Sequence, residues 1–216
     1  MRIDLQFDVC APVLQKVRIV GGLKEFPNWV AKLQNLVTLS LRRTYLTVDP
    51  LPLLKELPYL SSLFINRSAY EGKVLQFPNR GFQNLKQILL GSLFILKSIV
   101  IEDGALPSLE KFKLVGIPEL KEVPSGLYKL PKLEFPNRGF QNLNQILLNR
   151  LIGLKSIVIE DGALPSLEKL KLVDIPRLKK VPSGLSKLPK LEAMGFKCHG
   201  LLILHVDFHN NGTESS

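Results

Sequence analysis

The sequence predicts an α/β solenoid with a parallel sheet, and three observations support this prediction. The first is the segment LPSLEKLKL at 164–172, in which Leu167, Leu170 and Leu172 have the spacing L-x-x-L-x-L. Leu170 and Leu172 are two residues apart, so in a short strand they point to one side while the lysines between them point to the other. The second observation is that this spacing recurs, and the third is an internal duplication in which 77–134 recurs as 135–192. One such strand cannot bury its apolar side alone, so stacked copies are expected.

The first leucine of each motif marks the start of an expected strand. These leucines are Leu14, Leu36, Leu60, Leu85, Leu109, Leu143, Leu167 and Leu191. Successive position numbers differ by 22, 24, 25, 24, 34, 24 and 24. A period of about 24 with this motif is typical of leucine-rich repeats, whose period ranges from about 20 to 29. We therefore expect a leucine-rich-repeat horseshoe of about eight repeats, with a parallel concave sheet and short helical, 3-10 or extended convex segments.

The domain organisation follows from the repeats. Residues 1–200 are predicted to form one leucine-rich-repeat domain, and residues 201–216 its last convex segment and a frayed polar tail. Residues 77–134 and 135–192 are a tandem duplication, identical at 48 of 58 positions. The step of 34 from Leu109 to Leu143 is one full repeat of 24 followed by a remnant of 10, which predicts a truncated repeat at 133–142. Within it, we expect Leu133 to Gly139 to form a loop or a strand too short to hold full register.

The segments between the strands are of two kinds. Residues 26–36, 123–133 and 181–191 have a proline followed by apolar residues at helical spacing, which predicts one helical or 3-10 turn. Residues 96–109 and 154–167 instead have β-branched residues that end at Asp-Gly. That composition predicts an extended segment closed by a turn.

The chain is strongly basic. Its 29 Lys and Arg residues outnumber its 19 Asp and Glu residues, giving a net charge of +10. Such a balance fits nucleic acid, an anionic membrane surface or an acidic protein partner. No uninterrupted apolar run reaches the length of about 18 residues that a membrane span needs. Asp4 and Asp8 stand where a secretory signal requires an apolar run, so we expect a cytoplasmic location.

Partner binding is expected on the concave face, where the third, fifth and seventh places of each repeat point outward. We predict that the basic residues and one aromatic residue at these places bind a protein partner: Lys16, Arg18, Arg42, Phe64, Lys111, Lys113, Lys169, Lys171 and Lys197. The functional interpretation is a face for an acidic partner. The alternative is that the lysines only keep an exposed strand face soluble.

No catalytic, cofactor or metal site is expected. The acidic pairs Glu102–Asp103 and Glu160–Asp161 have no histidine or serine at a matching repeat position, so paired catalytic carboxylates are not favoured and we expect no enzyme activity. His199, His205 and His209 lie close together near the tail. A metal site would require that these ligands converge, and nothing in the sequence fixes the fold of this segment.

Several blocks in order carry a family resemblance. They are LKEFPNWVAKLQNLVTLSL (23–41), LTVDPLPLLKELPYLSSL (46–63), AYEGKVLQFPNRGFQNL (69–85) and IEDGALPSLEKFKL (101–114, repeated at 159–172). Over about residues 12–192 the chain resembles the leucine-rich-repeat region of plant intracellular nucleotide-binding disease-resistance proteins of the coiled-coil class. The resemblance implies a non-enzymatic recognition module in plant defence and innate immunity. It would bind a pathogen or host protein and, in a longer receptor, contact a nucleotide-binding switch domain. The chain has no P-loop, so nucleotide binding is not implied for it.

Two alternatives remain open at this stage. The junction in the duplication and the unfinished ends also fit a truncated receptor relic with no independent function. Nucleic-acid binding through the basic surface is less favoured, because Phe64 is the only aromatic residue at the outward strand places and stacking on bases needs aromatic side chains.

Overall fold

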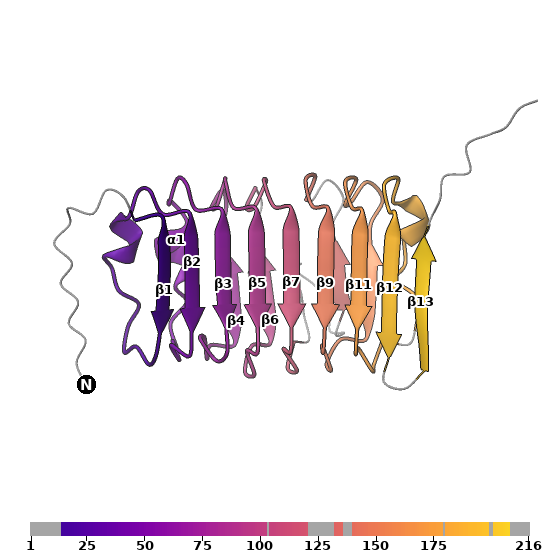
Figure 1. Ribbon diagram of the computed structural model, residues 1–216, viewed down its shortest axis with the longest axis horizontal. Coiled ribbons are helices and arrows are strands. Elements are labelled where there is room, and N and C mark those ends of the chain that lie inside the picture. The colour runs from indigo at the N-terminus through magenta and orange to yellow at the C-terminus, as the bar shows by residue number, and fades with distance from the viewer. Residues whose placement is uncertain are drawn as a thin grey trace, which may run out of the picture.

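A nine-stranded sheet runs along the whole solenoid (Figure 1). The computed structural model describes residues 14–102, 104–120, 132–135, 140–178, 180–198 and 201–207. Eight strands of the sheet pair in parallel and in sequence order. They are β1 (Lys16–Val20), β2 (Thr38–Arg42), β3 (Ser62–Asn66), β5 (Gln87–Gly91), β7 (Lys111–Val115), β9 (Gln145–Asn149), β11 (Lys169–Val173) and β12 (Ala193–Cys198). Each predicted motif forms one of these strands, which confirms the leucine-rich-repeat fold.

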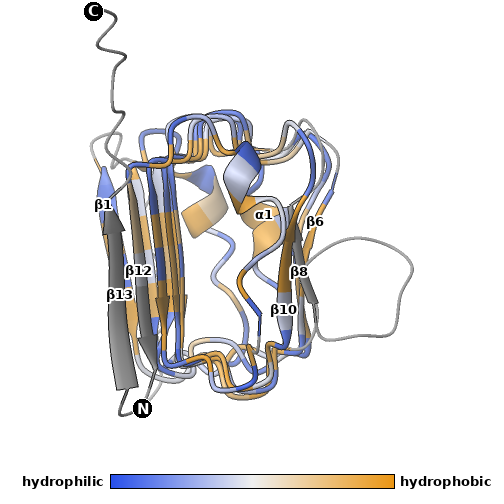
Figure 2. Ribbon diagram, turned by 90° about the vertical axis from the view of Figure 1, so that its right-hand side faces the viewer, coloured by the Kyte–Doolittle hydropathy of each residue, from blue (hydrophilic) through white to orange (hydrophobic). Residues whose placement is uncertain are grey.

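Most of the apolar motif residues form the core between two layers (Figure 2). In the repeat of β5, Leu85, Ile88 and Leu90 are at most 1% exposed. The strand residues between them point away from the core and are only partly buried, as the period of two requires. Burial of apolar surface stabilises the folded chain by about 25 cal/mol per Å². Each repeat covers the apolar side of the next repeat, so this burial holds the stack together.

The second layer is built from short strands and single helical turns. In it, β4 (Val74–Phe77) pairs with β6 (Ser98–Ile101), and β8 (Lys132–Phe135) pairs with β10 (Ser156–Ile159). The helical turns are η1 (Val30–Lys32), α1 (Leu51–Leu54) and η2 (Leu185–Lys187). The 3-10 turns expected within 26–36 and 181–191 and the extended segments expected within 96–109 and 154–167 are confirmed. Most of the third expected turn, 123–131, lies outside the described residues. In the described part of the chain, every helix is too short to cross a membrane.

The duplication junction does not interrupt the sheet. Strand β7 pairs with β9 at all five positions, although the step between their motifs is the longest in the chain. The prediction that Leu133 to Gly139 form a loop or a strand too short to hold full register is wrong for residues 133–135, because β8 pairs with β10 at all four of its positions in the second layer. The reason is that K-L-E-F of β8 and V-L-Q-F of β4 are each followed by P-N-R-G-F, so β8 takes the same place before the second copy that β4 takes before the first. Residues 136–139 lie outside the described residues.

The C-terminal end differs from the prediction. Residues 201–206 were expected to form a convex segment, whereas β13 (Leu201–Asp207) pairs antiparallel with β12 in the main sheet. Only residues 199–200 lie between the two strands. A parallel return needs a crossover of a dozen or more residues, so a link this short permits only an antiparallel neighbour. Residues 208–216, the predicted frayed tail, lie outside the described residues.

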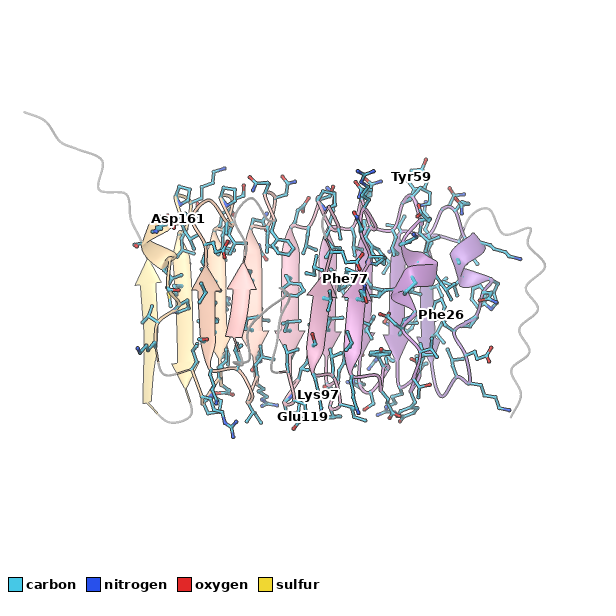
Figure 3. The ribbon with its side chains drawn as sticks, turned by 180° about the vertical axis from the view of Figure 1, so that it is seen from behind. Phe26, Tyr59, Phe77, Lys97, Glu119 and Asp161 are labelled. Atoms are coloured by element: carbon cyan, nitrogen blue, oxygen red, sulfur yellow. The ribbon has the colours of Figure 1, made fainter. Side chains whose placement is uncertain are left out.

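The loops at the two ends of the strands form two rims. We call the loops that follow the sheet strands the C-terminal rim and those that precede them the N-terminal rim. Lys97 and Glu119 lie at the C-terminal rim, while Tyr59 and Asp161 lie at the opposite edge (Figure 3). The residue directly after a strand is left-handed in repeat after repeat: Arg43, Arg67, Ser92, Gly116, Arg150 and Asp174 all have φ between 51° and 63°. This common backbone shape turns the chain away from the sheet at the same height in each repeat.

Asp49 joins α1 to β4 and makes stability depend on pH. Its carboxylate accepts hydrogen bonds from the backbone N–H groups of Leu51 (2.9 Å) and Gln76 (2.8 Å). Burial raises the pKa of Asp49 above its usual 3.8, although these two N–H groups act in the opposite direction. A pKa that is higher in the folded state gives stability that is fully present below about pH 3.8 and is lost as the pH rises through the folded pKa.

We therefore expect Asp49→Asn, which cannot ionise, to reduce the loss of stability between acid and neutral pH. Urea unfolding of both proteins across this range measures the difference. Equal pH dependence of the free energy of unfolding in the two proteins would contradict the assignment to Asp49.

Candidate functional site

The outward residues of the sheet form three rows of eight places. The strand register aligns Lys16, Arg18 and Val20 of β1 with the same places on each later strand. We call these 24 places on the eight parallel strands the sheet face; the structure describes the backbone of all of them and every side chain except that of Lys197. Eight of them are basic and none is acidic. The basic places are Lys16, Arg18, Arg42, Lys111, Lys113, Lys169, Lys171 and Lys197. The sheet face therefore carries charge of one sign only.

A hollow of about 350 Å³ brings four of the predicted residues together on β1 to β3. The hollow is lined by Lys16, Val17, Arg18, Thr38, Ser40, Arg42, Phe64 and Asn66. Phe64 on β3 supplies an apolar wall and Arg18 lies on β1, while Arg42 is on the middle strand β2 together with the hydroxyl residues Thr38 and Ser40. Such a mixture of an aromatic residue, guanidinium groups and hydroxyl groups suits a partner segment that has an acidic and an apolar side chain.

Four arginines gather at the end of this hollow. The positive charge of Arg67 is the largest cause that lowers the pKa of Arg42, followed by burial and by the charges of Arg18 and Arg43. Repulsion among like charges is relieved when an anion binds among them. Guanidinium groups also bind carboxylate and phosphate in a bidentate manner, so this cluster favours an anionic group of the partner.

The remaining predicted lysines form a second, separate group. Lys111 and Lys113 are on β7, and Lys169 and Lys171 are on β11. Strand β9 lies between them and presents Gln145, Leu147 and Asn149. Since neighbouring strands are about 4.8 Å apart, the two lysine pairs are separated by roughly 10 Å.

Two strands in the middle of the sheet, β3 at the edge of the hollow and β5 next to it, carry no charge on the sheet face. Strands β3 and β5 present Ser62, Phe64, Asn66, Gln87, Leu89 and Gly91. The basic residues predicted as one surface are thus two basic groups with a neutral strip between them. The side chain of Lys197, the last predicted residue, lies outside the described residues, although its backbone pairs with Val173 in the sheet.

Sequence reasoning missed several residues near the hollow. Asn66 lines it, and its side-chain oxygen is buried without a hydrogen-bond partner in the described structure. Arg43 and Arg67 were missed because only the third, fifth and seventh places were considered, and these arginines occupy the eighth. The recurrence of arginine at the eighth place, again at Arg150, was the signal that could have revealed them.

Two of the acidic residues singled out in the sequence, Glu102 and Asp161, have structural roles. The Glu102 carboxylate accepts a hydrogen bond from the backbone N–H of Asn79 at 2.6 Å and another from the Gln76 side chain. Asp161 forms an ion pair with Lys187, which links the repeats of β10 and η2. Within the described residues, no three His, Cys, Asp or Glu side chains are grouped as metal ligands. The sheet face is therefore the surface on which a functional argument can be built.

Known proteins are similar to the chain in sequence and in fold. No protein-family model matches the chain. The chain is 30% identical over 187 residues to the probable disease resistance protein RF9 of Arabidopsis thaliana, covering 69% of this chain and 18% of that protein. It is 37% identical over 122 residues to the disease resistance protein RPM1 of the same plant, covering 56% of this chain and 13% of that protein. The chain thus spans less than a fifth of the length of these relatives.

Among solved structures, the chain is similar to the leucine-rich repeat domain of the type III effector XopL. The TM-score is 0.62 at 23% sequence identity, and the match covers 87% of this chain and 62% of that chain. At this level of identity the likeness establishes the fold and carries no function with it.

Proposed function

We propose that this chain, a leucine-rich-repeat region of the kind found in plant disease-resistance proteins, recognises a pathogen or host protein through its sheet face. The fold and the relatives support a defence-related module for protein interaction. The proposal adds that the module is non-enzymatic, acts in the cytoplasm as the resistance receptors it resembles do, and in a longer receptor also contacts a nucleotide-binding switch domain.

One observation carries the choice of the sheet face. Its 24 places hold eight basic and no acidic residues, and three of the eight share a hollow with Phe64. An aromatic residue beside arginines is the composition that is enriched at energetically important positions of protein interfaces. Unbalanced positive charge also speeds association with an acidic partner. A face that needed basic residues only for solubility would not require three of them around a hollow with an aromatic wall.

The test is a charge reversal with a matched control. We expect Arg18→Glu combined with Arg42→Glu to weaken capture of the partner at least about tenfold, because two attractive contacts become repulsive. Lys24→Glu combined with Lys32→Glu makes the same change in net charge at exposed positions outside the sheet face, and we expect it to leave capture intact. The immobilised proteins are exposed to extracts of infected and healthy leaves, with and without nuclease treatment, and the retained proteins are quantified by mass spectrometry.

Two outcomes would contradict the proposal. If every protein retained by the wild type is also retained by the Arg18/Arg42 variant, the hollow is not the recognition site. Reversal of Lys111, Lys113, Lys169 and Lys171 to Glu then shows whether the second basic group binds instead. If nuclease treatment removes all retention, the basic surface binds nucleic acid, whose affinity falls steeply with salt.

The same samples address the alternative of a relic without independent function. The continuous pairing of β7 with β9 across the junction and the buried residues Leu114 and Leu148 support a chain that folds as one unit. We expect a single cooperative thermal transition for the wild type and for both charge variants. A broad transition would favour the relic.

A further inference from the structure

The tandem duplication allows two copies of one structure to be compared within a single chain. Residues 77–134 and 135–192 began as the same sequence and now differ at ten positions. Where those differences lie shows which surface has changed since the duplication. The differing pairs are Lys86/Asn144, Gly91/Asn149, Ser92/Arg150, Phe94/Ile152, Ile95/Gly153, Phe112/Leu170, Gly116/Asp174, Glu119/Arg177, Glu122/Lys180 and Tyr128/Ser186.

The differences gather on the C-terminal rim. In the described part of the first copy, residues 92–97 and 116–120 form this rim, and seven of them are not buried. Five of these seven differ between the copies: Ser92, Phe94, Ile95, Gly116 and Glu119. The other unburied positions described within 77–120 number 20, and only Lys86 among them differs. Exposure alone therefore does not account for the distribution.

The location of these positions in loops does not account for the distribution of the differences either. The N-terminal rim of the same copy, residues 78–86 and 102–110 without Asp103, has twelve unburied positions in loops, and one of them differs. Loops commonly vary more than strands, but the two rims are both loops. The sheet-face lysines are identical in the two copies, since Lys111 and Lys113 correspond to Lys169 and Lys171. The C-terminal rim has thus changed while the sheet face has kept its charges.

Two of the changes are matched to each other. In the first copy these two places are Ser92 and Gly116, and a Cβ added to Gly116 would lie 3.9 Å from the Ser92 hydroxyl oxygen. The second copy has Arg150 and Asp174 there. These two form an ion pair with Arg150 Nε 3.9 Å from Asp174 Oδ2. The rim has therefore kept a consistent structure as its charges changed, which random loss of constraint would not produce.

The changes make the rim of the second copy basic. In the first copy it holds Lys97 and Glu119, a net charge of zero, whereas in the second it holds Arg150, Lys155 and Arg177 against Asp174, a net charge of +2. The Arg150 side chain is 71% exposed, whereas that of Asp174 is 18% exposed. Ile152, in the same loop as Arg150, is 49% exposed and gives the basic rim an apolar contact point.

We propose that the C-terminal rim of the second copy, formed by Arg150, Ile152, Lys155 and Arg177, is a second protein-contact surface that binds an acidic partner segment carrying an apolar side chain. The arginines and the lysine pair with its carboxylates, and Ile152 packs against its apolar residue. This surface is separate from the sheet face. A partner could occupy both at once, so that the second contact makes binding tighter without any change in the hollow.

The duplication also supplies variants that fit the backbone. Each rim can be converted to the other with residues that already occupy the equivalent position. Gly153 stays unchanged, because a Cβ there would lie 2.7 Å from the Leu120 carbonyl oxygen. The first variant is R150S/I152F/D174G/R177E, and the reverse variant is S92R/F94I/G116D/E119R. Lys24→Glu changes the net charge by −2, as the first variant does, and serves as the control.

The experiment measures binding of a fluorescein-labelled peptide in which Glu and Asp alternate around one Leu, next to a second peptide with Gln and Asn in their place. We expect the wild type and K24E to bind only the acidic peptide, the first variant to bind it at least tenfold more weakly, and the reverse variant to bind it several-fold more tightly. A photo-cross-linking version of the acidic peptide is expected to label residues 150–155 and 174–178.

Three results would overturn the proposal. One is absence of binding of the acidic peptide to the wild type. Another is equal affinity in the wild type and the first variant. The third is cross-linking confined to the sheet face, together with loss of binding in the Arg18/Arg42 variant. That last result would assign the acidic ligand to the sheet face, so it separates failure of this proposal from failure of the proposed function.

Discussion

Phe77→Ala is expected to lower the free energy of unfolding by roughly 3–5 kcal/mol, the range for a fully buried phenylalanine whose removal leaves a cavity. Phe77 is 0% exposed at the end of β4, in the middle of the molecule between the two layers (Figure 3). Its ring packs edge to face against Phe82, with ring centroids 5.6 Å apart and an interplanar angle of 70°. Such an aromatic pair contributes about 0.5–1.5 kcal/mol in addition to the free energy of burying the side chain. Phe77→Ala removes both contributions.

A second phenylalanine of the same copy is the natural control. Phe94 is 57% exposed on the C-terminal rim, so we expect Phe94→Ala to change the free energy of unfolding by less than about 0.5 kcal/mol. Urea unfolding followed by circular dichroism measures both variants. Similar losses in the two would mean that Phe77 does not fill the space between the layers. A change in the slope of the transition for Phe77→Ala would indicate that neighbouring repeats no longer unfold together.

The strands of the main sheet were predictable because one short rule decides them. In L-x-x-L-x-L the apolar residues have a period of two, and the motif recurs at a nearly fixed interval, so both the strand and its neighbour follow from the sequence. Each of the eight motifs forms a parallel strand, and residues such as Lys111 and Lys113 point outward as their places predict. Membership of the sheet face was therefore predictable residue by residue.

The grouping of the site was not predictable in the same way. The hollow depends on Arg18, Ser40 and Phe64 standing side by side on three strands, and that alignment follows from the register between repeats of unequal length. The contribution of Arg67 depends on a left-handed residue just past the strand end, a conformation that arginine seldom adopts outside such a repeated turn. The spacing of outward residues along the sequence predicts neither the register between the strands nor the left-handed conformation of Arg67.

The two wrong predictions share one cause. Leu133 and residues 201–206 were assigned by analogy with other repeats, without weighing the length of chain on either side. The short link at 199–200 forces β13 to lie antiparallel to β12, and the x-L-x-F-P-N-R-G-F pattern places β8 in the second layer. Chain length and local pattern, more than the position of one leucine, decide where a segment goes in a solenoid.

Gly184→Ala is expected to lower the free energy of unfolding by roughly 2–5 kcal/mol, since two costs combine there. Gly184 has a φ of 86°, and a left-handed conformation costs an ordinary L-residue about 1–2 kcal/mol. In addition, a Cβ at this position would lie 2.1 Å from the carbonyl oxygen of Ile159 in β10. Overpacking of this kind costs about 1–3 kcal/mol, and here the neighbour is backbone that cannot rotate away.

Gly116→Ala distinguishes the conformational cost from the overpacking cost. Its φ of 63° is also left-handed, but the nearest atoms to an added Cβ are those of Ser92 at 3.9 Å. We therefore expect Gly116→Ala to cost only the conformational part, about 1–2 kcal/mol, and Gly116→Asp to cost less, because Asp174 holds the same place in the second copy with a φ of 51°. Urea unfolding ranks the three variants. Equal losses for Gly184→Ala and Gly116→Ala would show that the η2 turn can move away from β10. The close approach of Gly184 to β10 would then not be needed to hold the last turn of the second layer in place.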